Sequence, residues 1–544
     1  GVAACLVRIS VCAEVFCKGN YDRGGEGMSI ADKTANMSAL RVEKITADRE
    51  QVCINIPGTA MSEDTQFKVE FRAPYESPER PNLEEYATVS VQKDLTQGSV
   101  RISFSRMLGE RDLLYCKLFV YEIRDGEVLR IPGPCYAELR EAGAEWDYPY
   151  PAASTIKGLQ VKTFENVREL GLGHAALNVN LPCIVQSSDE NRAITFPCMG
   201  RIYYFNRAYM EQLDGRIKML SDGGTVVDLI ILTRAEWHDV WGDPVLTPLL
   251  LHPRFDPSGI VSAFHVTAEE PLMLFIACME FLAERYMRPD EKYGRACGWI
   301  IGNEVNAQWI YCNCGEMDMD TFLSEYQIAL RCAFYAVRKH YAQARVYISL
   351  DHCWNMLLEP NEKHFYRGKA LLDALQRNVR MEGDFDWGVA YHPFPEDLKR
   401  ADFWNDTTAI QSFDTGKITF RNVEILAAYL KQKQFLYRGR IRHIILSEQG
   451  LCSGGTPEGE QLQADAFVLA FYKIKAIPEI EAFIYHSHLD EKNEGLLLGL
   501  LAEDGRRKPI YDCFSAIDGP EGEGLLRAAC MRVGEKNYRK IGLQ

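Results

Sequence analysis

The sequence lacks the features that mark several large classes of protein. Its 544 residues carry a formal net charge of -15 and show no basic stripe, which argues against a nucleic-acid partner or an anionic membrane surface. No stretch approaches the roughly 20 apolar residues that a membrane span needs. Internal repeats and low-complexity tracts are also missing. With 47% hydrophobic and 25% charged residues, a chain of this length is expected to fold as two globular domains.

The 17 cysteines fall singly, without the C-x-x-C pairs that mark zinc sites. Cys312 and Cys314 are the closest pair, but one intervening residue is poor spacing for zinc. Disulfide frameworks belong to small secreted domains, so we expect unpaired thiols. The sequence therefore predicts no metal and no other cofactor.

Residues 1–40 give no interpretable pattern. Val2 to Cys17 are mostly apolar, but Arg8 and Glu14 interrupt them and no basic segment precedes them. This makes a poor signal peptide. We leave residues 1–40 unassigned, as a leader or a disordered segment.

Residues 41–140 show the pattern of short β-strands. Phe67–Phe71 and Val100–Phe104 alternate apolar and polar side chains at period two, and Leu118–Tyr121 precedes a turn at Asp125-Gly126. Strands at this spacing predict an immunoglobulin-like β-sandwich. A support domain packed on the rest of the chain is the favoured role, with carbohydrate binding as the alternative.

After a linker over residues 141–154, strands alternate with helices. One helix has Leu323, Tyr326 and Leu330 on one face, with Asp320 as its N-cap, and another runs near Glu269 to Tyr286. Eight strands are expected, at Lys157–Val161, Ala175–Leu181, Thr225–Leu232, Gly298–Glu304, Arg345–Asp351, Asp386–His392, Arg442–Glu448 and Ala482–His488.

Such alternation implies a parallel sheet with right-handed crossovers. Eight units within residues 155–520 fit a closed (β/α)8 TIM barrel, an α/β fold, and residues 521–544 form a C-terminal extension. An open doubly wound sheet is the rival. It would show a glycine-rich turn after the first strand, and no such glycines follow Lys157–Val161.

Glu304 and Glu448 each follow a short apolar run, at the ends of predicted strands four and seven. Barrel enzymes place their chemistry at the carboxyl ends of the strands. Two carboxylates there can flank one glycosidic bond, with one protonated to assist the leaving oxygen and the other ionised to attack the sugar. The alternative is that each glutamate forms a buried salt bridge.

Asn303-Glu304 on strand four with Glu448 on strand seven resembles clan A of the retaining glycoside hydrolases. More closely, residues 155–515 resemble a bacterial family known as domain of unknown function 5722. The segments that carry this likeness are GWIIGNEVN (298–306), ARVYISLDHCWN (344–355), GDFDWGVAYHPFP (383–395), HIILSEQG (443–450) and AFIYHSHLD (482–490). The resemblance implies a TIM barrel and, through the clan, Glu304 as the acid/base and Glu448 as the nucleophile.

The resemblance also implies that Asn303 hydrogen-bonds the sugar 2-hydroxyl. Tyr391 and His392, at the end of strand six, are expected to orient Glu448 or the substrate. Asn178 and Asn180 share one side of strand two. These two asparagines either line the pocket or satisfy loop backbone.

Many clan members have a tryptophan at the end of strand eight, where this chain reads Tyr485-His486-Ser487-His488. The floor of the sugar site is therefore expected from Trp354 or Trp309, although Trp354 could simply pack within its loop. His352, His486 and His488 are further candidates for substrate contacts. A His-x-His pair also occurs in metal-dependent barrel hydrolases, but the accompanying ligands are not evident here.

A loop of more than 30 residues, from Arg234 to Val266, follows strand three. It carries Trp237, Trp241 and the pair His238-Asp239. Loops of this length are commonly functional, so a lid or a subsite wall is expected. A surface excursion without a ligand role is the alternative.

The sequence thus predicts a retaining glycoside hydrolase that acts on a neutral or plant-type oligo- or polysaccharide. A non-catalytic glycan-binding barrel and a metal-dependent hydrolase are the alternatives. The expected partner is a carbohydrate substrate, without nucleic acid or a membrane span. The sugar, the linkage, exo or endo action and the oligomeric state stay open. The unpaired thiols favour the cytoplasm, and a secreted or cell-surface location is the other option.

Overall fold

The computed structural model describes residues 37–57, 65–76, 86–87, 90–94, 98–124, 126–164, 166–237, 240–491 and 495–543. Three expectations fall outside these residues. They concern residues 1–36 of the possible leader, Asp125 of the predicted turn, and the pair His238-Asp239 in the long loop.

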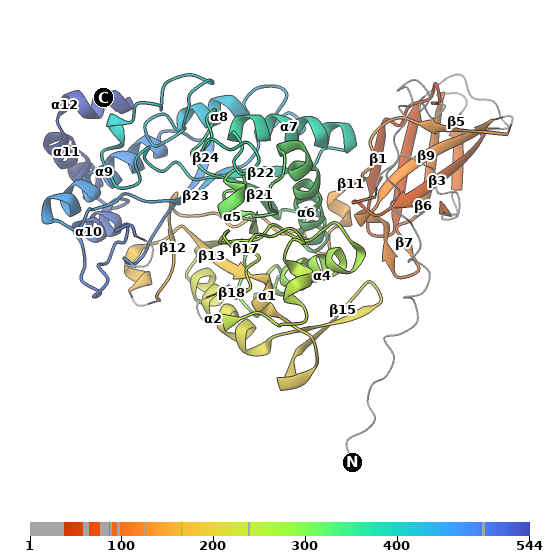
Figure 1. Cartoon of the computed structure of the whole chain (residues 1–544), viewed down its shortest axis with the longest axis horizontal. Coiled ribbons are helices and arrows are strands. Elements are labelled where there is room, and N and C mark those ends of the chain that lie inside the picture. The colour runs from red at the N-terminus through yellow and green to blue at the C-terminus, as the bar shows by residue number, and fades with distance from the viewer. Residues whose placement is uncertain are drawn as a thin grey trace, which may run out of the picture.

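Two small sheets form the N-terminal part of the molecule (Figure 1). The five-stranded sheet has the order β11-β1-β2-β6-β5, and the four-stranded sheet has the order β10-β9-β3-β4. Their strands are β1 (Lys44–Ala47), β2 (Gln51–Pro57), β3 (Gln66–Arg72), β4 (Tyr86–Ala87), β5 (Ser90–Asp94), β6 (Ser99–Ser105), β9 (Lys117–Arg124), β10 (Glu127–Ile131) and β11 (Glu138–Leu139). Alternate side chains, such as Val52 and Ile54 of β2, are fully buried. The predicted β-sandwich is confirmed.

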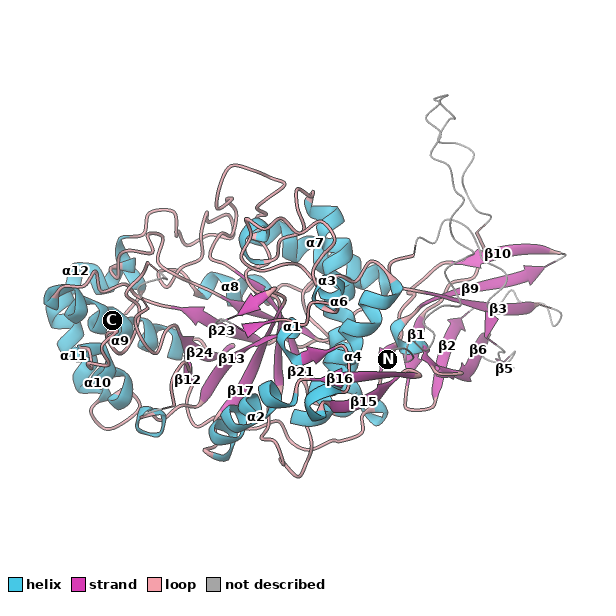
Figure 2. Cartoon of the chain, turned by 60° about the horizontal axis from the view of Figure 1, so that its bottom comes forward, coloured by secondary structure: helices cyan, strands magenta, loops and turns pink. Residues whose placement is uncertain are grey.

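The following part is a closed barrel of eight parallel strands, in the order β12-β13-β17-β20-β21-β22-β23-β24 (Figure 2). The strands are β12 (Lys157–Gln160), β13 (His174–Asn180), β17 (Val226–Leu232), β20 (Gly298–Ile301), β21 (Arg345–Leu350), β22 (Trp387–Tyr391), β23 (Ile444–Gln449) and β24 (Ile480–Tyr485). Each of the eight predicted strands is present, so the predicted TIM barrel is confirmed. Each strand pairs with the next one in this order, and β12 closes the barrel because its Gly158 pairs with Ile484 of β24.

Helices cover the outside of the barrel. The main ones are α2 (Arg207–Asp222), α4 (Glu269–Tyr286), α6 (Met319–His340), α7 (Gly368–Glu382), α8 (Glu424–Leu430), α9 (Pro457–Lys475), α10 (Pro509–Ala516) and α11 (Gly522–Val533). The helix expected near Glu269 to Tyr286 is confirmed. The N-cap of α6 is Asp318, whose carboxylate accepts a hydrogen bond from the Thr321 N–H at 2.9 Å. The prediction of Asp320 as the cap was wrong, because α6 begins at Met319 and includes Asp320.

The inside of the barrel is filled by one small apolar cluster. It consists of Ala176, Ile230, Leu232, Val261, Ile300, Tyr347, Ala390, Ile445, Ala482 and Ile484. Since side chains alternate along a strand, the residues two places beyond these point to the mouth at the carboxyl ends. That alternation puts Asn178, Ser349, His392 and Ser447 on the inward side.

The sandwich rests against the helices of the barrel. The Tyr115 hydroxyl donates to Glu280 of α4, and the Tyr335 hydroxyl of α6 donates to the Ala137 carbonyl at 2.6 Å. Lys339 of α6 forms an ion pair with Asp112 at 3.1 Å. Figure 1 shows the sandwich beside α6, with α11 and α12 (Glu535–Tyr538) at the opposite end of the barrel. Among the described residues, no helix is both long and apolar enough to cross a bilayer.

Candidate active site

Glu304 lies just beyond β20, the fourth barrel strand, in a tight turn. Its φ is 40°, in the left-handed region that residues with a side chain rarely adopt. The Ser349 hydroxyl accepts a hydrogen bond from the Glu304 N–H at 2.9 Å, and the Glu304 carbonyl accepts one from the Ala307 N–H at 2.7 Å. These contacts hold the strained residue in place, and such strain is concentrated at functional sites.

His392 joins the ends of strands four, six and seven. Its Nδ1 lies 2.8 Å from Oε1 of Glu304, and its Nε2 lies 3.0 Å from the Ser447 hydroxyl. Ser447 directly precedes Glu448 in β23. One imidazole ring therefore fixes the Glu304 carboxyl relative to the strand that carries Glu448.

The protonation of Glu304 is shifted by its surroundings. Burial raises the pKa of Glu304, and the nearby carboxylates of Asp351 and Glu448 raise it further, against the opposing effect of His392. Burial alone would lower the pKa of His392, but its hydrogen bond to Glu304 and the surrounding negative charge raise it. The pair is therefore suited to hold a proton at the mouth of the barrel.

Glu448 has a different environment. The Gln160 amide donates to Oε2 of Glu448 at 2.8 Å, and the same amide nitrogen lies 3.2 Å from the Ser447 carbonyl. The carbonyl oxygen of Gln160 lies 2.7 Å from Nδ1 of His486. A donor aimed at a carboxylate favours its ionised form. Strand one thus supports the carboxylate on strand seven, and His486 supports Gln160.

The three asparagine candidates, two on strand two and one after strand four, lie in two kinds of environment. Asn178 is half-buried on the inward side of β13, and Asn303 is half-buried beside Glu304. Asn180 is fully buried, and its side chain donates to the Arg234 carbonyl at 2.9 Å and accepts from the Arg234 N–H at 2.8 Å. For Asn180, the structure matches the alternative in which it satisfies loop backbone.

Two aromatic candidates are wholly buried. Trp354 has 0% exposure, donates its indole N–H to the Phe413 carbonyl at 3.0 Å, and packs edge-on against Tyr391 and Tyr429. Tyr391 also has 0% exposure. Neither ring has a face that a sugar could contact, which corrects the expectation that Trp354 floors the subsite. The reason is that Tyr391 lies on the outward side of β22, where Trp354 covers it.

The histidine candidates also differ in role. The Phe394 carbonyl lies 3.1 Å from Nδ1 of His352, and Lys417 Nζ lies 3.0 Å from its Nε2. Burial, helped by the Lys417 charge, lowers the pKa of His352 to about 4. His488 is fully buried, which lowers its pKa to about 4, whereas His486 is half-buried and contacts Gln160.

The other tryptophan candidates follow strands four and three. Trp309 is half-buried and stacks on His364, with 3.7 Å between ring centroids. In the long loop, β18 (Glu236–Trp237) pairs with β19 (Val240–Trp241). Trp237 packs against the apolar cluster inside the barrel, while Trp241 is 69% exposed. Trp237 is therefore the better candidate for an aromatic wall at the mouth of the barrel.

Several residues of this site were not predicted. Gln160, Ser349 and Ser447 lie on the inward side of their strands, and the period-two pattern could have identified them. Asp351 lies on the same side of strand five, and its carboxylate accepts hydrogen bonds from the Asn306 amide and the Cys353 N–H. The described residues include no group of three or more His, Cys, Asp or Glu side chains placed to bind a metal ion.

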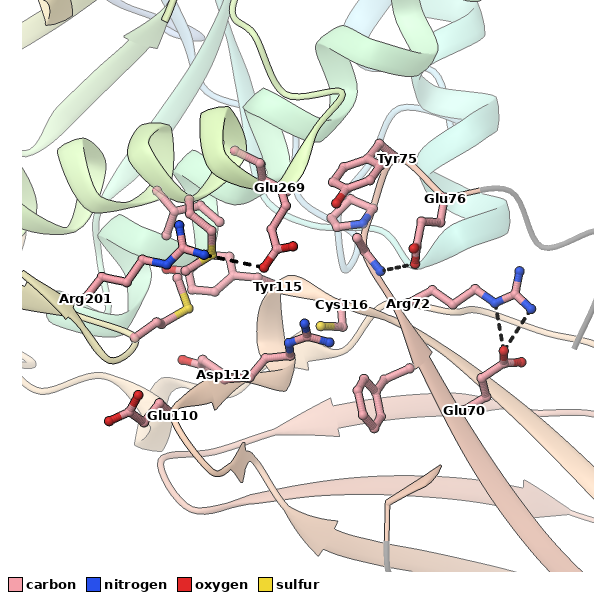
Figure 3. A pocket seen from close by; sticks show the side chains of 18 residues that line it. Glu70, Arg72, Tyr75, Glu76, Glu110, Asp112, Tyr115, Cys116, Arg201 and Glu269 are labelled. Atoms are coloured by element: carbon pink, nitrogen blue, oxygen red, sulfur yellow. Dashed lines mark hydrogen bonds and ion pairs between the residues drawn. The ribbon is translucent and has the colours of Figure 1, made fainter. Parts of the chain in front are cut away.

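A cavity of 690 Å³ lies elsewhere, between the sandwich and the barrel (Figure 3). Four of its charged side chains pair with one another: Arg72 contacts Glu70 at 2.8 Å, and Arg201 lies 3.6 Å from Glu269. None of the barrel-strand ends contributes to its lining. The candidate active site is therefore the mouth of the barrel.

Comparisons with known proteins give one family and several distant structures. No curated protein matches the chain. The chain is similar to a family 39 glycoside hydrolase from the gut symbiont Bacteroides cellulosilyticus WH2, at 13% identity and a TM-score of 0.44, over 88% of this chain and 82% of that one. It is also similar to the family 1 β-glucosidase from Thermotoga maritima, at 12% identity and a TM-score of 0.41, over 65% and 84%. A third similar structure is Fpglu1 from Fervidobacterium pennivoraus, at 15% identity and a TM-score of 0.42, over 70% of this chain and 87% of that one.

Likenesses this distant carry no conclusion about function. The family match is of another kind, because it covers most of the chain. Residues 149–541 match the family described as Family of unknown function (DUF5722), and the protein belongs to that family.

Proposed function

We propose that the protein is a retaining glycoside hydrolase, with Glu304 as the general acid/base and Glu448 as the nucleophile. The observation that carries this proposal is the His392 bridge between the Glu304 carboxyl and Ser447, next to Glu448. It fixes the Glu304 carboxyl relative to the strand that carries Glu448, and the environments of these two carboxyl groups differ. Such a difference is what paired acid and nucleophile roles require.

In the first step, the ionised Glu448 attacks the anomeric carbon while Glu304 gives its proton to the leaving oxygen. Burial and the neighbouring carboxylates favour the protonated form of Glu304 that this step needs. The Gln160 amide supports the ionised form of Glu448. The step leaves the sugar covalently bound to Glu448.

In the second step, the ionised Glu304 takes a proton from a water that attacks the same carbon from the side of the departed group. The sugar leaves with its original anomeric configuration. His392 is then beside a carboxylate, and its raised pKa lets it carry a positive charge there. We assign His392 the role of holding Glu304 in position through both steps.

A panel of aryl glycosides tests the proposal. Glu448→Ala should abolish turnover of every substrate that the wild type cleaves. Glu304→Ala should hydrolyse substrates with good leaving groups, such as 2,4-dinitrophenolate, far better than those with poor ones, because only the latter need the proton. A uniform loss across leaving groups would count against Glu304 as the acid. Sugar binding by calorimetry without any turnover would instead support a glycan-binding barrel.

A further inference from the structure

Two basic side chains beside the candidate active site form no direct ion pair with a carboxylate among the residues that the structure describes, although the charge of Glu236 acts on one of them, Arg234. These are Arg234, two residues beyond β17, and Lys417, in the loop that follows strand six. Other buried cations of the barrel have hydrogen-bond partners: Arg442 lies 2.8 Å from Asp384, Lys508 lies 3.0 Å from Asp490, and the Arg331 guanidinium donates to the Gly383 carbonyl at 2.8 Å. A half-buried charge without a counterion is costly, and an anion bound beside these two side chains would offset that cost.

Arg234 is held by its backbone while its guanidinium stays available. Its N–H and carbonyl are both bound by the Asn180 side chain, which fixes it at the carboxyl end of strand three. The guanidinium carbon lies 5.0 Å from the centroid of the Trp237 ring, and Trp237 packs on the cluster inside the barrel. Stacking on an aromatic ring leaves the N–H fork of an arginine free to bind an anion.

Lys417 is held by two neutral acceptors. Its Nζ lies 3.0 Å from Nε2 of His352 and 3.2 Å from the Glu396 carbonyl. Because the Phe394 carbonyl takes the proton on Nδ1 of His352, Nε2 can only accept from the ammonium. The Glu396 carboxylate is occupied by the N–H groups of Thr407 and Thr408. One of the three N–H donors of the Lys417 ammonium therefore remains for a ligand, and the two neutral acceptors leave its charge in place.

Lys417 is also rigidly placed at the mouth. Its backbone forms an isolated antiparallel β-bridge with Cys353, and the adjoining Ile418 N–H donates to the His352 carbonyl at 3.0 Å. These contacts tie it to the end of strand five, which neighbours the strand that carries Glu304. Arg234 lies on the other side of that strand, since β20 pairs with both β17 and β21.

We infer that the sugar bound at this site is anionic, and that Arg234 and Lys417 bind its carboxylate or sulfate group. This inference rests on the proposed function and changes its substrate class, because the sequence alone favoured a neutral glycan. A planar guanidinium matches the two oxygens of a carboxylate or sulfate, and a fixed ammonium adds a point charge. In a chain with a net charge of -15, such cations also attract an anionic ligand that the rest of the surface repels.

The test uses 4-nitrophenyl glycosides in matched sets that differ only in the group at C5, which is a hydroxymethyl group, a carboxylate or a hydroxymethyl group esterified with sulfate. Wild type should show a higher kcat/KM for an anionic member, and the preferred member distinguishes carboxylate from sulfate. Arg234→Gln and Lys417→Gln should each lower the ratio of anionic to neutral kcat/KM by about 10- to 100-fold, as loss of a charge-assisted hydrogen bond implies. Lys417→Arg, which keeps the charge, should retain more of the ratio than Lys417→Gln.

Arg201→Gln is the matched control, because Arg201 pairs with Glu269 at the distant cavity. It should leave the ratio unchanged. A wild-type preference for the neutral member in every set would overturn the inference, and so would an equal fall of the ratio in Arg201→Gln. Urea midpoints of each variant separate these results from loss of folding.

A second measurement separates this inference from the proposed function. If wild type hydrolyses no glycoside of any set, the proposed function fails, and calorimetry with digalacturonate and a neutral disaccharide then decides. Tighter binding of digalacturonate that is weakened by salt and by Arg234→Gln would uphold the anion site. Equal binding, or none, would overturn it.

Discussion

Gln160 is expected to set the pH at which the enzyme becomes active. Its amide donates to the Glu448 carboxylate at 2.8 Å, and Gln160→Met removes this donor while keeping the length of the side chain. A hydrogen bond to a charged group contributes about 1.5–3 kcal/mol. One pH unit corresponds to about 1.4 kcal/mol, so ionising Glu448 in the variant should require a pH roughly one to two units higher.

The assay is the pH dependence of kcat/KM on the best aryl glycoside from the panel. Because the nucleophile must be ionised in the free enzyme, its ionisation sets the acid limb of the profile. In Gln160→Met this limb should move to higher pH, while the rate on the plateau falls less than the rate at low pH.

Gln449→Met is the matched control. Gln449 follows Glu448 in the same strand, but its amide donates to the Leu446 and Ile484 carbonyls. Its loss should reduce stability and leave the acid limb in place. An unmoved acid limb in folded Gln160→Met would refute the role of Gln160, and an equal shift in Gln449→Met would attribute the effect to general loosening of the strand.

Two further predictions concern stability. Burial raises the pKa of Asp228 to about 7, against the effect of Arg345, so between pH 4 and 7 the folded state binds more protons than the unfolded state and wild-type stability falls as pH rises. Asp228→Asn should therefore gain urea resistance relative to wild type from pH 4 to pH 8, and a constant difference would contradict this. Arg442 has 0% exposure and bonds Asp384, Gln376 and three backbone carbonyls, so Arg442→Met should lower the free energy of unfolding by about 3–5 kcal/mol. Arg400, an exposed arginine that pairs with Asp402, is the control, and Arg400→Met should cost at most about 1 kcal/mol in the same urea titration.

The barrel could be predicted from the sequence because each of its strands is a short apolar run with its own local pattern. The two glutamates stood out for the same reason, since each is a charged residue at the end of such a run. The start of α6 could not be located from the sequence alone. Asp318 and Asp320 are both acidic and two residues apart, and only the backbone of Asp318 is extended as a cap requires.

The rest of the site depends on closure of the barrel. Gln160 meets Glu448 although 288 positions separate them, because β12 pairs with β24 and β24 pairs with β23. Lys417 reaches His352 from a loop 65 positions away. Trp354 could not be assigned from the sequence, because a tryptophan after a strand can equally face the pocket or fold back over the outside of the barrel.

The central claim is a covalent intermediate on Glu448. The most direct test is to incubate the protein with the 2-deoxy-2-fluoro form of its best aryl glycoside and locate the added mass by peptide mass spectrometry. A retaining enzyme with this nucleophile should gain one sugar per chain, attached to Glu448. Attachment to another carboxylate, or release of product with inverted configuration and no attached sugar, would contradict the account.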